Sequence, residues 1–173
     1  MPRIAVVLLF ALYLATNLPG PAAAEGWTVG PAPSDHPDLM AATVVNEDGH
    51  TLYLWELIDE DRRQIYCEMH LAEGMRFGDG MPVYRIDSGA PVDTADIRDA
   101  GDARDALWAH VGESVAFWLV WSDRAGDAEI LPWLRGREVE ISFHTADGSK
   151  RTTRFSLAGS AEAIRKATGF AQN

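Results

Sequence analysis

Short apolar segments separated by turn signals recur along most of the chain, and this pattern constrains the fold more than any other feature. Residues 41–45 and 50–58 flank Asn46-Glu47-Asp48-Gly49, where glycine fits the turn position that needs a positive φ. Thr145-Ala146-Asp147-Gly148 is a second hairpin signal. About eight such strands without regular helix alternation predict a mainly β fold, an antiparallel β-sandwich or small barrel.

One strand shows which of its faces enters the core. Apolar residues at every second position, Ile65, Cys67, Met69 and Leu71, alternate with more polar ones. Because side chains alternate across a strand, this period-2 pattern predicts that Cys67 points inward.

The end of the chain carries the signals of one short C-terminal helix. Ser160 is suited to cap residues 161–167, and Gly169 follows where a helix would end. Glu162 in the first turn and Lys166 in the last complement the helix dipole. The sequence therefore predicts a β domain closed by a single short helix.

The first residues have the pattern of an export signal. Arg3 precedes an apolar run at residues 4–14, and Ala22-Ala23-Ala24 forms an A-x-A site. The run has eleven residues, whereas a membrane-spanning helix needs about 20. We therefore expect a signal peptide at 1–24, an extended segment at 25–38 and one β-rich domain at 39–173, with no membrane span after cleavage and a periplasmic or secreted location.

Charge and cysteine content limit the partners and the sources of stability. The chain has 15 basic and 26 acidic side chains, a net charge of −11, which argues against nucleic acid because phosphate affinity depends on Lys and Arg. Cys67 is the only cysteine. An exported domain would otherwise use disulfides, so stability must come from packing.

Residues 93–105 form an acidic stretch with a carboxylate at every third position. Its aspartates are suited to Ca²⁺, but the spacing of a D-x-D-x-D-G loop is missing and Arg98 and Arg104 are interleaved. We expect a solvated loop here, with calcium binding as the alternative.

Aromatic residues supply the candidates for a partner surface. Trp108, Phe117 and Trp121 lie in or near an aromatic strand at residues 115–121, one face of which has no obvious covering element. Ordinary burial under the C-terminal helix is the alternative for these rings.

A second reading is a soft-metal site. Thiolate and thioether ligands from Cys67, Met69, Met75 and Met81 suit Cu(I). A small hydrolase is a third possibility, because carboxylate pairs could come from Asp87, Glu113, Asp123 or Glu129. No complete nucleophile motif is present, so no catalytic residue is assigned and no cofactor is expected.

Several segments together resemble a group of exported bacterial proteins. They are a strand at residues 82–87, the strand at 118–121, a turn at 130–136, and residues 153–159 followed by Glu162-Ala163-Ile164. The pattern, which spans 81–167, resembles the invasion-associated locus B family and the periplasmic accessory proteins of type VI secretion similar to TagO or VasI. Members often carry paired cysteines, unlike this chain.

The resemblance implies a β-rich accessory protein of the Gram-negative cell envelope without enzymatic chemistry. Together with the export signal and the acidic charge, it leads us to expect a non-enzymatic binding protein whose partner is a protein or another envelope component. A periplasmic copper-binding protein is the alternative.

Overall fold

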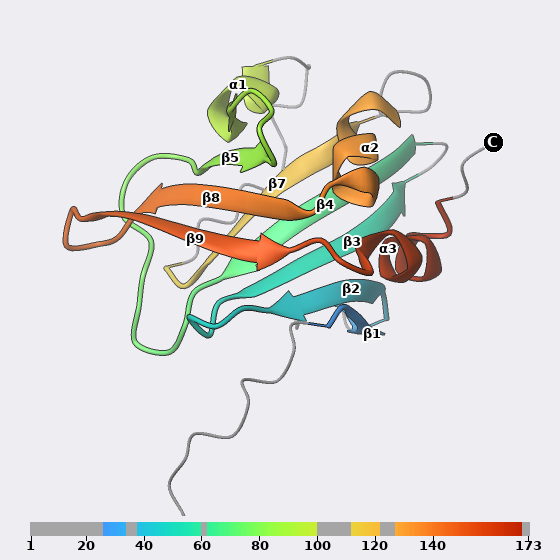
Figure 1. Ribbon diagram of the computed structural model, residues 1–173, viewed down its shortest axis with the longest axis horizontal. Helices are drawn as coiled ribbons and strands as arrows, with labels where there is room; N and C mark the ends of the chain where they lie inside the picture. Colours follow the sequence, from blue (N-terminus) through green and yellow to red (C-terminus); the bar gives the residue numbers. More distant parts are fainter. Residues whose placement is uncertain (1–25, 34–37, 60–61, 100–111, 122–126, 171–173) are drawn as a thin grey trace, which may run out of the picture.

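The structure, a computed structural model, describes residues 26–33, 38–59, 62–99, 112–121 and 127–170. Within these ranges the chain forms two antiparallel sheets and three helices (Figure 1). The expectation of a mainly β, sandwich-like fold is confirmed, and neither sheet closes into a barrel.

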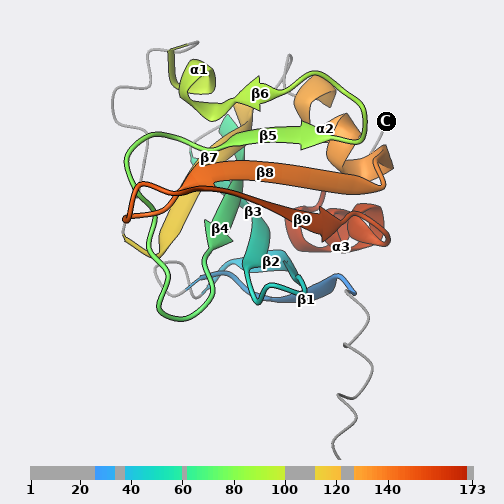
Figure 2. The same ribbon diagram turned by 60° about the vertical axis from the view of Figure 1, so that its left-hand side comes forward.

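The two sheets have five and four strands. The first has the order β1-β2-β3-β4-β7 and consists of β1 (Thr28–Pro31), β2 (Met40–Val45), β3 (Thr51–Asp59), β4 (Arg62–His70) and β7 (Ser114–Trp121). The second has the order β6-β5-β8-β9 and consists of β6 (Val92–Asp93), β5 (Val83–Ile86), β8 (Glu138–His144) and β9 (Lys150–Ser156). Figure 2 shows the smaller sheet in front of the larger one, with their strands running in different directions.

Both predicted hairpins are confirmed. In the β2–β3 turn the Gly49 amide donates to the Asn46 carbonyl over 3.0 Å, and Gly49 has a φ of 79°. In the β8–β9 turn the Gly148 amide donates to the Thr145 carbonyl over 2.8 Å. Both glycines adopt the left-handed conformation that a residue with a Cβ atom rarely takes.

The core fills the space between the two sheets. Cys67 lies opposite Leu54 on β3 and Phe117 on β7, so these three side chains share the inner face of the larger sheet. From the smaller sheet, Tyr84 stacks on Phe117 with a ring-centroid distance of 5.6 Å. The predicted inward direction of Cys67 is therefore confirmed, since its side chain is fully buried.

A bulge interrupts the pairing of β4 with β7. Ile65 pairs with Val120 and Tyr66 with Trp118, so Leu119 is the extra residue. A bulge inserts one residue and lets its side chain change direction relative to the regular alternation. Leu119 is 2% exposed and belongs to the same core cluster as Phe117.

The predicted C-terminal helix is confirmed, and the described ranges contain two further helices. Besides α3 (Ser160–Thr168), the structure has α1 (Thr94–Asp99) and α2 (Asp127–Arg135). In α2 the residues at positions i, i+3 and i+4, Ile130, Trp133 and Leu134, are buried, which is the pattern of a helix with one face in the core.

The start of α3 differs from the prediction. Gly159, with a φ of 87°, is the N-cap residue, and no side chain caps the helix there. The Ser160 hydroxyl instead donates to the Trp133 carbonyl over 2.7 Å and so connects α3 to α2. The predicted helix end is confirmed, because Gly169 adopts a left-handed conformation and its amide donates to the Arg165 carbonyl.

The acidic stretch at 93–105 is partly helical where the structure describes it. Asp93 accepts a hydrogen bond from the Ala95 amide over 2.9 Å, as a residue at a helix start does. Thr94 is fully buried and its hydroxyl donates to the Pro82 carbonyl. The expected loop begins instead with α1, and residues 100–105 lie outside the described ranges.

Candidate functional site

The predicted aromatic surface is described only in part. Phe117 is 2% exposed and its ring packs between the sheets against Tyr84. Trp121 is the last residue of β7, and its side chain lies outside what the structure describes, as does the whole of Trp108. In the described structure Phe117 serves the core and offers no surface to a partner.

The residues of the soft-metal hypothesis lie in and around the core. Cys67 and Met69 are fully buried on the inner face of β4, whereas Met75 and Met81 are partly buried and pack against the same core. Burial raises the pKa of the Cys67 thiol well above its usual value, and the nearby Glu68 carboxylate raises it further. The thiolate that a metal would need is therefore disfavoured.

Among the residues that the structure describes, no group of three or more His, Cys, Asp or Glu side chains could hold a metal ion. The hydrolase candidate Asp87 accepts hydrogen bonds from the backbone amides of Arg137 and Glu138, each over 3.1 Å. This carboxylate holds the start of β8 in place.

We expect the Cys67 thiol of the native protein to be almost unreactive toward a thiol-specific reagent. Its side chain is buried and its pKa is raised, so reaction has to wait for unfolding. The measurement is the rate of colour release from an aromatic disulfide reagent, with and without concentrated guanidinium chloride. Equal rates in the two solutions would show an accessible thiol and would favour the soft-metal reading.

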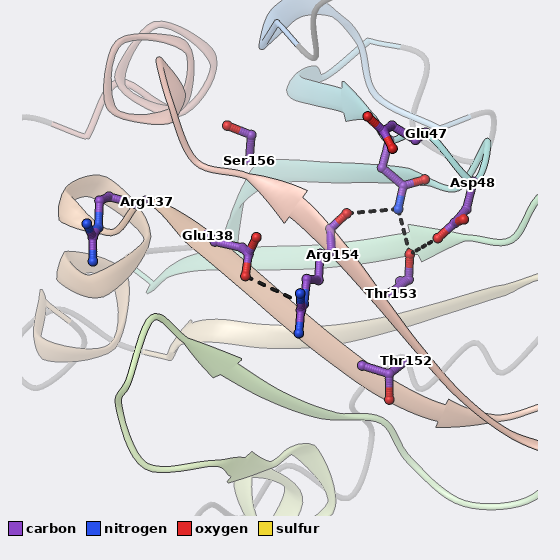
Figure 3. Close-up of a pocket in the computed structure, with 9 residues that line it drawn as sticks. Glu47, Asp48, Arg137, Glu138, Thr152, Thr153, Arg154 and Ser156 are labelled. Atoms are coloured by element: carbon purple, nitrogen blue, oxygen red, sulfur yellow. Dashed lines mark hydrogen bonds and ion pairs between the residues drawn. The ribbon is translucent and has the colours of Figure 1, made fainter. Parts of the chain in front are cut away.

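A polar groove lies beside β9. We call it the β9 groove. It has a volume of about 580 Å³ and lies between the β2–β3 turn and the outer side of β8 and β9 (Figure 3). All of its lining residues are polar or charged: Asn46, Glu47, Asp48, Arg137, Glu138, Thr152, Thr153, Arg154 and Ser156.

One wall of the groove is held by a hydrogen-bonded cluster, which we call the Asn46 cluster and which consists of Asn46, Asp48 and Thr153. The Asn46 amide donates to the Thr153 hydroxyl over 2.6 Å and to the Arg154 carbonyl over 2.9 Å. The Thr153 hydroxyl donates to Asp48 over 2.8 Å. Asn46 and Thr153 are 7% and 3% exposed, so these bonds join the two sheets in a nearly dry environment.

An ion-pair network crosses the smaller sheet and includes two residues of the groove lining, Glu138 and Arg154. Arg154 donates to Glu140 over 2.8 Å and lies 3.6 Å from Glu138, while Arg85 donates to Glu140 over 2.6 Å. The hydrogen bond from Arg154, followed by the charges of both arginines, lowers the pKa of the Glu140 carboxyl. Because the guanidinium of Arg154 is already shared by two carboxylates, its charge is largely compensated.

The edge of β9 is covered near its C-terminal end. The Leu157 amide donates to the Arg137 carbonyl, so residue 157 directs its backbone groups toward the β8 side. Backbone groups alternate in direction along an antiparallel strand, and the carbonyls of Arg154 and Ser156 therefore point away from β8. The Asn46 amide binds the first carbonyl and the Trp27 indole binds the second, over 2.8 Å. These two side chains occupy the outward carbonyls at the end of β9, and covering part of an edge in this way helps to protect it from uncontrolled pairing.

A second, smaller depression lies on the other end of the same sheet. It has a volume of about 290 Å³ and includes Met81, Arg85, Glu140 and His144 among its lining residues. Met81 is therefore next to a surface depression, whereas Cys67 and Met69 are buried between the sheets. The structure places these members of the soft-metal set in different surroundings.

The chain was compared with protein families, with curated proteins and with solved structures. No family model, curated protein or solved structure matches the chain. The resemblance to the invasion-associated locus B family and to the type VI secretion accessory proteins thus stays a prediction. In the described ranges, no helix is long and apolar enough to cross a membrane.

Sequence reasoning did not identify the β9 groove. It predicts a turn at Asn46-Glu47-Asp48-Gly49, and this turn is confirmed. The local signal for a site was the pair of adjacent acidic residues, Glu47 and Asp48, in that turn. Nothing in the sequence connects that turn with Thr153, which lies more than a hundred positions away.

Proposed function

We propose that this chain is an exported, non-enzymatic binding protein of the bacterial cell envelope that takes a neutral or basic polypeptide segment into the β9 groove. The observation that carries the proposal is the all-polar lining of a groove whose wall is fixed by the Asn46 cluster. A preformed polar site loses little conformational entropy on binding, so its hydrogen bonds can contribute to affinity.

The charges of the groove favour a basic ligand over an acidic one. The β2–β3 turn presents the exposed carboxylates of Glu47 and Asp48 at one end, and Figure 3 shows Arg137 at the far end. Arg154 between them is already compensated by Glu138 and Glu140. With a net charge of −11 on the whole chain, an acidic partner would be repelled before it reached the site.

The chemistry of the lining also favours polypeptide over nucleic acid. Among the residues that the structure describes, no aromatic side chain lines the groove, so bases have no surface there on which to stack. Backbone amides of an extended peptide can instead donate hydrogen bonds to the exposed Thr152 hydroxyl and to the carboxylates of the lining. The export signal in the sequence and the resemblance to envelope proteins support a role outside the cytoplasm.

The charge of the turn provides a sharp test with a matched control. Peptides selected from a displayed random library on the mature protein are expected to bind Glu47→Lys about tenfold more weakly, because one favourable charge contact is reversed. Isothermal titration calorimetry measures the difference. Glu73→Lys changes the net charge equally at another exposed glutamate, outside the groove lining, and we expect less than a twofold effect.

Two results would contradict the proposal. One is a selection that returns no peptide with measurable affinity. The other is an equal loss of binding in Glu47→Lys and Glu73→Lys, which would show general attraction to an acidic protein rather than recognition in the groove.

A further inference from the structure

A buried histidine lies directly behind the Asn46 cluster. His50 is 4% exposed, and its ring meets the Phe143 ring edge-on with a centroid distance of 5.9 Å. The backbone amide of His50 donates to the Asn46 side-chain oxygen over 2.9 Å. His50 is therefore bonded to the same side chain that holds β9 to the β2–β3 turn.

The hydrogen bonds of His50 require a neutral ring. Its Nδ1 atom accepts a hydrogen bond from the Ala72 backbone amide over 2.9 Å. A ring nitrogen that accepts an N–H cannot carry a proton of its own, so the neutral form with the proton on Nε2 is the one that fits. Protonation at Nδ1 would place two N–H groups against each other and would bury a charge.

The surroundings of the ring oppose protonation more than they favour it. Burial lowers the pKa of His50, and the negative charge of Asp48 in the adjacent turn raises it by a smaller amount. The packed groups from the other elements are uncharged: the Phe143 ring from β8 and the Ala72 amide from the segment after β4. The nearest acidic neighbour in that segment is the exposed Glu73.

We propose that His50 makes the β9 groove sensitive to pH, so that a ligand held at neutral pH is released in acid. Protonation of the ring ends the bond to Ala72 and displaces residue 50, and the displacement reaches Asn46 through the backbone amide of His50. Loss of the Asn46 bonds to Thr153 and Arg154 then opens the wall of the groove. This inference rests on the proposed function of the groove as a binding site.

The direction of the effect follows from linkage. Because the pKa of His50 is lower in the folded than in the unfolded protein, the unfolded protein binds more protons as the pH falls below about 6.5. Protonation of His50 leaves the free energy of unfolding unchanged above about pH 6.5, the pKa of His50 in the unfolded chain. The free energy of unfolding falls as the pH is lowered from there to the pKa of His50 in the folded protein. The affinity for a ligand that needs the closed groove falls over the same pH range, because proton binding and ligand binding oppose each other reciprocally.

The experiment compares wild type, His50→Asn and His144→Asn by urea unfolding at about pH 7.5 and about pH 5. Asparagine places an oxygen near the position of Nδ1 and does not titrate, so His50→Asn is expected to lose less stability on acidification than wild type. The difference amounts to at most about tenfold in the folding equilibrium constant per pH unit. His144 is exposed, and its variant should follow wild type.

NMR of the wild-type protein provides a test that does not depend on the folding of His50→Asn. In wild type the Asn46 side-chain amide signals should shift with the same midpoint as the His50 ring. A groove-binding peptide selected at neutral pH should bind wild type more weakly at about pH 5, and this loss should be smaller in His50→Asn. The inference would be overturned if the stability and peptide affinity of wild type and His50→Asn depended equally on pH. It would also be overturned if the Asn46 side-chain signals did not shift while the His50 ring titrated.

The two failures can be told apart. If no peptide binds at any pH but the Asn46 signals follow His50, the proposed function is wrong and the pH-sensitive contact is correct. If peptides bind with unchanged affinity across the His50 titration, the groove is a binding site and the pH sensitivity is wrong.

Discussion

Replacing Phe117 by alanine is expected to lower the free energy of unfolding by about 3–5 kcal/mol. The Phe117 ring is 2% exposed and stacks on Tyr84 of the opposite sheet, so truncation leaves a cavity between the sheets. Surrounding side chains can fill such a cavity only partly, which is why deletions from a packed core cost more than the transfer of the removed atoms. Urea unfolding followed by tryptophan fluorescence measures the change.

Two control variants make this experiment decisive. Phe117→Leu keeps most of the buried volume, and we expect it to cost clearly less than the alanine variant. Met40→Ala removes an apolar side chain that is 46% exposed and should change stability by less than about 0.5 kcal/mol. If Phe117→Ala proved as stable as wild type and instead lost affinity for a partner, Phe117 would belong to a surface after all.

Replacing Asn46 by alanine should cost about 2–4 kcal/mol of stability and should remove ligand binding in the β9 groove. The variant leaves the His50 amide and the Arg154 carbonyl without their partners in a nearly dry environment. Thr153 keeps its bond to Asp48, so its hydroxyl is not left entirely alone. Unsatisfied buried groups cost more than the hydrogen bond itself contributes, because water cannot replace the missing partner.

The control for Asn46→Ala is Thr152→Ala. Thr152 also lines the groove, but it is exposed and its hydroxyl contacts Ser142 at the surface, so the expected change is within about 0.5 kcal/mol. Asn46→Ala should also expose the Arg154 carbonyl on the edge of β9, and we expect more association between copies in light scattering. A cost below about 1 kcal/mol for Asn46→Ala would show that the cluster does not join the sheets.

Phe117 and Asn46 stabilise the contact between the sheets in different ways. Phe117 stabilises the contact between the sheets through packing, whereas Asn46 stabilises one edge of that contact through hydrogen bonds. The groove depends on the second kind of interaction. The proposed binding site is held by polar contacts and can therefore respond to pH through His50, whereas the apolar core cannot.

The sequence by itself determined the elements whose signals are local. Alternation placed Cys67 inside, glycine chemistry fixed the turns at Gly49 and Gly148, and Gly169 ended the last helix. Each of these features depends on residues within a few positions of one another. Period-2 burial and positive φ angles act at that range, so they can be read without knowing the rest of the fold.

The tertiary structure alone decided where those elements meet. Whether the Phe117 ring faced a partner or the core depended on Tyr84 from the other sheet, and the cap of α3 changed because Ser160 found the Trp133 carbonyl. In the wall of the β9 groove, Asn46 is hydrogen-bonded to Thr153, which lies 107 positions away in the sequence. Such contacts arise from how two sheets stack, and stacking is set by the summed burial of many side chains, which no local pattern encodes.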